Sequence, residues 1–483
     1  DTNSGQQKST KFVFDTATNG IGQLDHADSP DGINTSYTYD SHGRPTATTV
    51  TDTGANKSFT TTVGYDSYSR LKTTAYPDTP SAGRFTTTAG YNPYGYANGL
   101  DDTTNAASPK KLQTITGVNL DGQLTDATLG TIDPASDPTH ALTVHNMYDA
   151  ATGRVKELTT KQGTETLRRD IAYTYFDDGL IKTRTQKDTT SAGTRAEAYD
   201  YDAAGRLTTW DLTNNTSPKT TTTYQYDTAG NLTAVTGGPN PDETRTYGRD
   251  DNTLPHALTA DSDLGHGGKE TYTYDQQGRQ TSSNVSGQTR RTIDGYTAFD
   301  LPTAITQNGK TTKYAYDAFG TRIKATGPEG TDYTLGLTEE HTDPAGKHTW
   351  IHNIPGIGHV LDNGTTYTTQ FTTTDIQNST TSILDDHGNP TTDPTNKTQN
   401  FFYDPYGAHT DPTGKHTTPT GDTHHGYTAQ HHDTNQDLIN LNGRLYDPLQ
   451  KNLTTPDPIT TNHPYTYVNS NPTNNTDPTG YND

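Results

Sequence analysis

The sequence contains no cysteine, one methionine and two tryptophans among its 483 residues. The lack of cysteine excludes disulfide bonds and thiolate metal sites. Hydrophobic residues make up only 27% of the chain, and no apolar run approaches the ~18–20 residues of a membrane-spanning helix. So low an apolar fraction favours disorder when taken alone. The case for a fold therefore depends on the residues that are abundant.

Helical patterning is also missing. No stretch keeps apolar residues at positions i, i+3, i+4 and i+7 for more than two turns, and 45 glycines and 27 prolines interrupt every run. In contrast, the chain has 30 tyrosines and is rich in β-branched threonine. Both residue types suit a half-buried sheet surface. We predict an all-β protein.

The formal net charge is −22. An acidic surface repels the phosphates of DNA and RNA, so we do not expect a nucleic-acid partner. The charge is consistent with a solvated surface, or with an acidic wall around a basic cargo.

One short unit recurs along the chain: aromatic-x-Tyr-Asp, two residues, then Gly-Arg and often an apolar residue. It returns every 25 or 26 residues over long stretches and somewhat faster later. Good copies are Tyr37–Arg44, Tyr199–Leu207, Tyr224–Leu232, Tyr272–Arg279 and Tyr314–Ile323.

Each unit predicts one β-hairpin. Tyr-x-Tyr is an alternating strand with both rings on one face. Asp-x-x-Gly predicts a turn, since the aspartate can accept a hydrogen bond from the backbone two residues on and glycine tolerates a positive φ. A single hairpin is marginally stable, so stacked copies should share one sheet with a ladder of tyrosine rings along it.

Tyr-Asp-x-x-Gly-Arg-Leu at this period resembles the YD repeat of the Rhs family, which includes the C component of insecticidal Tc toxins and the teneurins. The resemblance runs from about Phe14 to Gly480. It implies hairpins that spiral into a large hollow shell, closed by an Rhs-associated core. The segment Thr374–Asn389 is similar to the family's entry into that core, with Asn378 where glycine is usual. The expected domains are a YD-repeat β-shell at 1–349 and an Rhs-associated core with a C-terminal autoproteolysis region at 350–483.

A carboxylate pair near the end of the chain, Asp457 and Asp477, is the main candidate for chemistry. Two carboxyl groups that share a site do not both ionise easily, so one can activate water while the other keeps its proton. Arg444 could orient a carboxylate or polarise a carbonyl. The residues alone equally allow that both aspartates cap turns.

The family resemblance favours chemistry. It implies self-cleavage near an Asp-Pro-x-Gly-Leu end, which Asp477-Pro478-Thr479-Gly480 matches, with Tyr481 in place of leucine. By this analogy an aspartic autoprotease cuts after Tyr481, before Asn482. Two similar motifs, Asp343–Gly346 and Asp411–Gly414, are expected to be plain turns.

Other constellations are weaker. His424, His425, His431 and His432 resemble a metal cluster, but no helix places them on one face, so we expect no metal and no cofactor. The tyrosine ladder could stack on sugars, although packing within the shell is the expected use of the rings.

The sequence therefore supports two hypotheses. The first is a secreted or cell-surface bacterial container: the shell holds a C-terminal toxin cargo, beyond Asp483, and releases it by self-cleavage, with delivery or plug proteins as further partners. The second is a cell-surface adhesion or carbohydrate-binding repeat protein with no cutting activity. Because the chain begins at Asp1 without an initiator methionine, we expect a fragment or a processed form.

Overall fold

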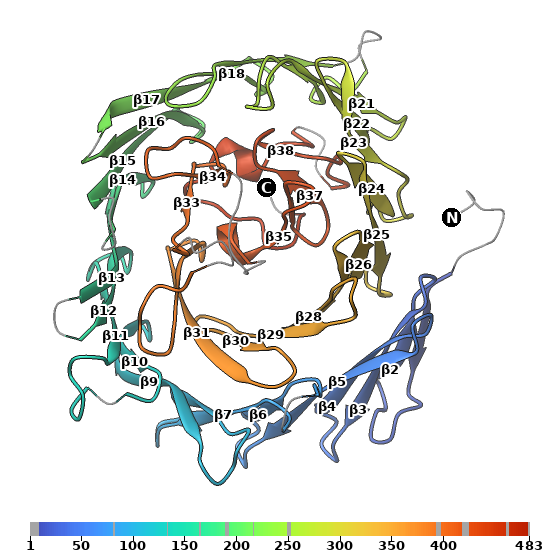
Figure 1. Cartoon of the computed structure of the whole chain (residues 1–483), viewed down its shortest axis with the longest axis vertical. Helices are drawn as coiled ribbons and strands as arrows, with labels where there is room; N and C mark the ends of the chain where they lie inside the picture. Colours follow the sequence, from blue (N-terminus) through green and yellow to red (C-terminus); the bar gives the residue numbers. More distant parts are fainter. Residues whose placement is uncertain are drawn as a thin grey trace.

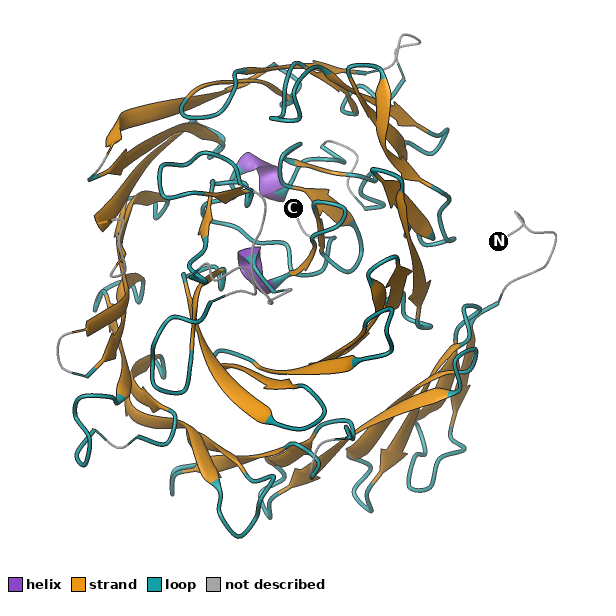
Figure 2. Ribbon diagram, in the orientation of Figure 1, coloured by secondary structure: helices purple, strands orange, loops and turns teal. Residues whose placement is uncertain are grey.

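The computed structural model of the protein describes residues 9–80, 83–132, 134–163, 166–188, 193–215, 217–248, 253–392, 398–417, 425–459 and 463–481. Over these residues the fold is almost entirely β, as predicted (Figure 2). The helical elements among them are two three-residue 3-10 turns. No described helix is long and apolar enough to cross a membrane.

Most strands belong to one sheet of 32 strands, in which each strand pairs antiparallel with the next along the chain. Its first half consists of β1 (Lys11–Phe14), β2 (Leu24–Asp28), β3 (Ile33–Tyr39), β4 (Pro45–Asp52), β5 (Lys57–Tyr65), β6 (Leu71–Ala75), β7 (Thr86–Tyr91), β8 (Ala97–Asp102), β9 (Lys110–Val118), β10 (Leu124–Leu129), β11 (Leu142–Tyr148), β12 (Val155–Gln162), β13 (Thr166–Tyr175), β14 (Ile181–Asp188), β15 (Gly193–Tyr201) and β16 (Leu207–Asn214).

The second half consists of β17 (Ser217–Tyr226), β18 (Leu232–Gly237), β19 (Glu243–Tyr247), β20 (Leu258–Asp261), β21 (Glu270–Tyr274), β22 (Gln280–Val285), β23 (Gln288–Ile293), β24 (Ala304–Gln307), β25 (Lys310–Tyr316), β26 (Arg322–Gly327), β27 (Gly330–Leu335), β28 (Thr338–Thr342), β29 (His348–Ile354), β30 (Gly358–Asp362), β31 (Tyr367–Thr374) and β32 (Thr380–Leu384).

A small set of elements follows and lies inside the ring that the sheet forms (Figure 1). These elements are β33 (Phe402–Tyr403), β34 (His409–Thr410), η1 (Tyr427–Ala429), β35 (His431–Asp433), β36 (Leu438–Asn440), β37 (Leu445–Asp447), β38 (Asn452–Leu453) and η2 (Val468–Ser470). With their described connections (residues 398–417, 425–459 and 463–481) we call them the inner segment.

The repeat forms hairpins by the predicted local chemistry. In the copy at β15–β16, Asp202 Oδ1 accepts hydrogen bonds from the amides of Ala204 (2.9 Å) and Arg206 (3.0 Å). Gly205 occupies the left-handed region at φ 77°, where residues with a side chain are disfavoured. The strand register shifts by one residue at Tyr201, immediately before the turn. This bulge ends the regular pairing at the mouth of the turn.

Successive copies are joined by side chains that the turn positions. Tyr226 donates its hydroxyl to the carbonyl of Leu207 in the preceding copy at 2.8 Å. Arg206, which is paired with Asp202 at 2.6 Å, lies over the Tyr226 ring at 4.5 Å. The same tyrosine-to-carbonyl contact recurs from Tyr39, Tyr65, Tyr91, Tyr148, Tyr175, Tyr201, Tyr247, Tyr274, Tyr296 and Tyr316.

The sheet curls past its own beginning. Strands β2–β7 lie outside β27–β31 (Figure 1), and the two layers share an apolar cluster that includes Ile33 and Tyr333. Polar pairs also connect them: Tyr333 donates its hydroxyl to Asp52 at 2.8 Å, and Lys57 pairs with Glu340 at 2.9 Å. The hairpins thus form a spiral, shell-like wall, as the fold prediction required.

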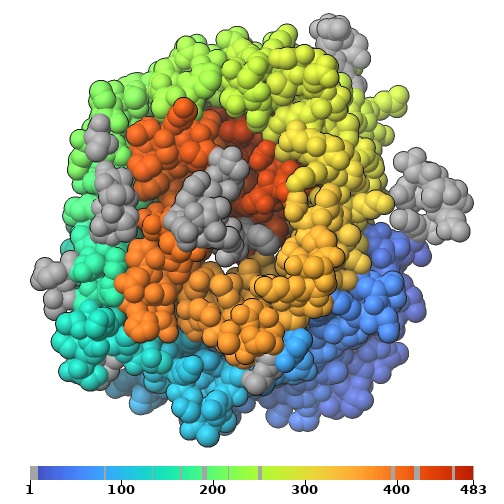
Figure 3. Space-filling view, in the orientation of Figure 1, coloured from blue at the N-terminus to red at the C-terminus, as the bar shows by residue number. Residues whose placement is uncertain are grey.

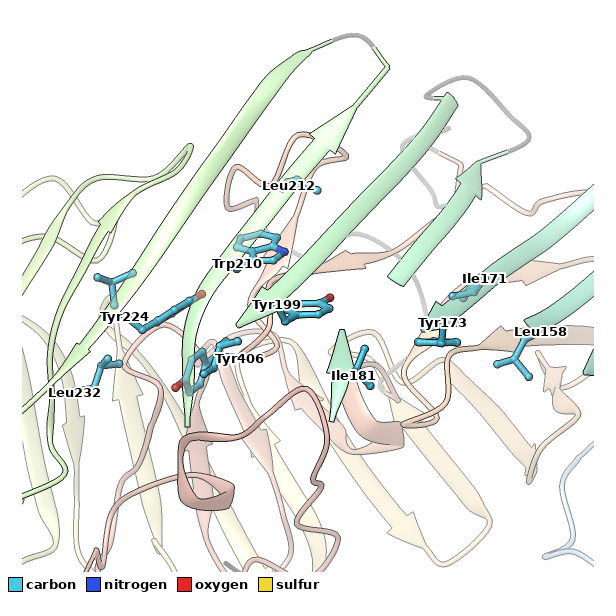
Figure 4. Packing of buried hydrophobic residues seen from close by; sticks show 12 residues of the cluster. Leu158, Ile171, Tyr173, Ile181, Tyr199, Trp210, Leu212, Tyr224, Leu232 and Tyr406 are labelled. Carbon is cyan, nitrogen blue, oxygen red and sulfur yellow. The ribbon is translucent and has the colours of Figure 1, made fainter. Parts of the chain in front are cut away.

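The inner segment packs against the inside of this wall, and its orange to red atoms line the interior of the ring in Figure 3. Its Tyr406 joins the shell cluster around Tyr199, Trp210 and Tyr224 (Figure 4), and the rings of Tyr224 and Tyr406 are 5.5 Å apart. The predicted boundary between 349 and 350 falls within β29, and the continuous sheet runs on to β32. The division into two domains stays a prediction.

Candidate active site

Three predicted site residues come together at the end of the inner segment. Arg444 directly precedes β37, Asp457 follows β38, and Asp477 lies beyond η2. All three are buried, with exposed fractions of 2%, 7% and 1% respectively. Short strands and turns bring them together, because β37 and β38 pair antiparallel and so place the start of one beside the end of the other.

The two carboxylates meet at one guanidinium nitrogen. Arg444 Nη2 is 2.9 Å from Asp457 Oδ2 and 3.7 Å from Asp477 Oδ2. A buried carboxylate is costly to ionise without a partner, and the arginine charge lowers that cost for both groups. The site is therefore a buried triad of two acids and one permanent cation.

Asp457 and Asp477 also cap turns, which is the other role that the sequence allows for them. Asp457 Oδ1 accepts the Ile459 amide at 2.7 Å, and Asp477 Oδ1 accepts the Gly480 amide at 2.8 Å. Each aspartate thus uses one oxygen to cap a turn and directs the other toward Arg444. Turn capping holds the carboxylates in a fixed orientation, which a catalytic pair requires.

Arg444 also contacts the predicted cleavage segment. Its Nε donates to the Gly480 carbonyl, and its Nη1 donates to the Pro464 carbonyl at 3.1 Å. Gly480 immediately precedes Tyr481, where the cut is predicted. Partial burial raises the pKa of the Tyr481 phenol, and nearby Arg444 opposes that shift. Asn482, on the other side of the predicted cut, lies outside the described residues.

This geometry can support acid–base chemistry on a nearby peptide bond. One ionised carboxylate can take a proton from water, and its protonated partner can donate to a carbonyl oxygen. Arg444, which already holds the Gly480 carbonyl, can fix the backbone next to the bond.

The two look-alike motifs behave as the predicted turns. Asp343 Oδ1 accepts the amides of Ala345 (2.9 Å) and Lys347 (2.8 Å). Asp411 Oδ1 accepts those of Thr413 (2.8 Å) and Lys415 (3.1 Å). Asp411 is therefore a matched control for Asp477, with the same Asp-Pro-Thr-Gly sequence.

The histidines make contacts within the protein. His425 Nε2 is 2.9 Å from Glu339, His431 Nδ1 is 3.3 Å from Asp433, and His432 Nε2 accepts the Tyr427 amide at 2.9 Å. His424 lies outside the described residues. Within the described ranges, the group with metal-ligand spacing is Asp385, Asp386 and His387, an acidic turn on the surface.

Sequence reasoning missed three contributors. Gln430 and Asn442 donate side-chain amides to the Pro478 carbonyl at 3.4 and 3.3 Å, and Gly443 donates its backbone amide to the Thr479 carbonyl at 2.9 Å. The Asn442-Gly443 dipeptide signals a turn. No local pattern, however, shows that residues 478–481 lie along it.

Comparison with known proteins supports the repeat interpretation. The RHS Repeat family model matches residues 201–239 and 296–332. No curated protein matches the chain. Three solved structures are similar over 98% of the chain: TcdB2-TccC3-TEV (TM-score 0.76, 15% identity), TcdB2-TccC3 (0.72, 15%) and a mutant of the Photorhabdus luminescens Tc holotoxin pore (0.75, 14%).

The matches cover 25%, 26% and 24% of those solved chains, so this chain spans about a quarter of their length. At such low identity the likeness establishes the fold. Together, the matched RHS repeats, the YD turns joined from copy to copy, and the shared spiral wall identify the chain as an Rhs/YD-repeat protein.

Proposed function

We propose that this YD-repeat shell protein encloses a C-terminal polypeptide toxin and detaches it by cutting its own chain between Tyr481 and Asn482. One observation carries the proposal: Arg444 contacts both buried carboxylates and also binds the Gly480 carbonyl, next to the predicted bond. This contact places the guanidinium of Arg444 beside the backbone that leads into the predicted cleavage bond.

The proposed reaction is hydrolysis of one peptide bond. Asp457, the closer partner of Arg444, is the ionised base and takes a proton from water while the water oxygen adds to the Tyr481 carbonyl carbon. Protonated Asp477 donates to the carbonyl oxygen. Collapse of the tetrahedral intermediate returns one hydroxyl proton to Asp477 and breaks the C–N bond, and the leaving nitrogen takes a proton from Asp457. The products are a carboxyl group on Tyr481 and an amine on Asn482.

The wider assignment follows from the same proposal. The cargo continues from Asn482 past Asp483 and is held by the wall until the cut frees it from the shell. The solved relatives are Tc toxin components, which supports secretion or surface exposure in a bacterium and association with delivery or plug proteins.

The test uses the chain extended past Asp483 by a reporter domain. We expect intact mass spectrometry to show cleavage after Tyr481 in the parent, and no cleavage in Asp457→Asn or Asp477→Asn. Asp411→Asn, in the same local motif, should be cut at the parent rate. Cleavage that persists in both site variants would contradict the aspartate roles.

A second function, glycan binding at a cell surface, is favoured by a different observation. The ladder tyrosines use their hydroxyls within the wall, but Tyr68, Tyr94 and Tyr96 at nearby turns are 78%, 87% and 64% exposed. Exposed rings of this kind can stack on sugars. An uncut parent that binds a glycan array through these tyrosines, with binding lost in Tyr68→Ala/Tyr94→Ala, would favour this function over the container.

A further inference from the structure

The last described residues lie along the turn at 441–444 as a bound peptide lies in a cleft. Each carbonyl from 478 to 480 has a protein donor: Gln430 and Asn442 for Pro478, the Gly443 amide for Thr479, and Arg444 Nε for Gly480. Backbone contacts of this type recognise a segment by its main chain and leave specificity to side-chain positions.

Two glycines, Gly443 and Gly480, allow residues 478–481 to lie close to the turn at 441–444. Gly480 has φ 76°, and a Cβ there would be 2.6 Å from the backbone nitrogen of Arg444 and 2.8 Å from the Leu441 carbonyl oxygen. Residue 480 therefore has to be glycine for both conformational and steric reasons.

Gly443 makes a different contact, with the ring of Tyr481. A Cβ on Gly443 would be 2.3 Å from Cε2 and 2.4 Å from Cζ of that ring, and 2.8 Å from the Thr479 carbonyl oxygen. Its backbone lies outside the left-handed region, so alanine would fit locally. The space above Gly443 is occupied by the outer half of the tyrosine ring, a part that a leucine side chain lacks.

We propose that Gly443 is the specificity-determining residue of the cleavage site: its missing side chain creates the subsite for a large aromatic residue directly before the cut bond. This inference rests on the proposed self-cleavage and adds its recognition element. The bound sequence class is Pro-x-Gly-aromatic, with Gly480 required for approach and the ring of residue 481 seated on Gly443. Tyr481, which stands where leucine is usual, therefore fits the space above Gly443 in this chain.

The cleavage test compares four versions of the chain carrying the reporter domain: parent, Gly443→Ala, Tyr481→Leu and the double variant. Gly443→Ala should slow cutting at least tenfold beside Tyr481, but less than threefold in the Tyr481→Leu background, because leucine ends short of the added methyl group. The contact with the Thr479 carbonyl affects both backgrounds alike and cancels in the comparison. Gly54→Ala, at an exposed turn with φ outside the left-handed region and only an Asp52 oxygen at 3.4 Å, should cut at the parent rate.

A second measurement keeps this inference separate from the proposed activity. In the 483-residue chain, hydrogen exchange of the peptide covering 478–481 should be at least tenfold faster in Gly443→Ala than in the parent. In the double variant it should return toward the rate measured in Tyr481→Leu alone. If the parent is never cut but exchange follows this pattern, self-cleavage fails and the subsite stands. Equal effects of Gly443→Ala in both backgrounds, in cutting or in exchange, would overturn the subsite.

Discussion

At the scale of the residue, three side chains of the repeat unit have separate roles. Aspartate shapes the turn, arginine pairs with it, and tyrosine reaches the preceding copy. The arginine contact is strong enough that, in the exposed turn at Asp40, its hydrogen bond holds the pKa of that carboxyl down to about 2. The tyrosine contact links copies, since each hydroxyl bonds a carbonyl of the preceding copy.

The tyrosine link predicts a stability difference between buried and exposed copies. Tyr316 is 6% exposed and donates to the Pro302 carbonyl at 2.7 Å. Tyr316→Phe leaves that buried carbonyl without its donor and should cost about 1–3 kcal/mol. Tyr65→Phe, whose contact with Pro45 is exposed to solvent, should cost about 0.5 kcal/mol or less, since water replaces the hydroxyl. Urea unfolding of both variants beside the parent gives the comparison, and equal costs would contradict the proposed role of burial.

At the scale of the element, the hairpins were predictable and their layering was not. Asp-x-x-Gly fixes a turn within a few residues, so the copy at Tyr199–Leu207 could be assigned from sequence alone. The overlap of β2–β7 with β27–β31 depends on pairs such as Lys57 and Glu340, separated by 283 positions, and no local pattern encodes that meeting. The site divides in the same way. Its aspartates were found by motif, whereas Gly443 is recognisable only once the ring of Tyr481 is placed.

The overlap of layers predicts a pH effect through His352 on β29. This imidazole is fully buried between Tyr76 (5.3 Å) and Phe85 (5.2 Å) of the outer layer. Burial lowers its pKa to about 4, although Asp362 opposes the shift. The unfolded chain, with a pKa near 6.5, therefore binds the proton first, and the stability that His352 contributes is complete above pH 6.5 and falls as the pH drops toward 4.

The measurement is the free energy of unfolding at pH 7 and pH 4.5 for the parent and for His352→Gln. The variant should lose roughly 2 kcal/mol less than the parent between these pH values. If the parent and His352→Gln lose the same free energy of unfolding between pH 7 and pH 4.5, His352 does not carry the acid sensitivity.

At the scale of the whole molecule, arginines of the wall hold the inner segment. Arg195 donates to the Tyr403 carbonyl at 2.9 Å, Arg245 to the Gln450 carbonyl at 2.6 Å, and Arg291 pairs with Asp447 at 2.8 Å. These side chains belong to β15, β19 and β23 and are buried. The wall therefore does more than surround the inner segment, because its buried arginines bond directly to groups of that segment.

Removing one of these anchors should loosen the inner segment. Arg291→Met leaves Asp447 buried without its cation, which typically costs about 3–5 kcal/mol. Lys310→Met breaks the exposed pair with Glu329 and should change the stability little, because water screens an exposed ion pair. Limited proteolysis should cut within 398–481 faster in Arg291→Met than in Lys310→Met. Equal protection of the two variants would argue against anchoring.

The self-cleavage account is tested most directly by the first residue of the released fragment. The chain extended past Asp483 by a reporter domain is expressed, and the reporter fragment is sequenced from its N-terminus and weighed. We expect a fragment that begins at Asn482, a partner fragment that ends at Tyr481, and neither fragment from Asp457→Asn. A fragment that begins elsewhere, or a parent chain that stays whole, would contradict it.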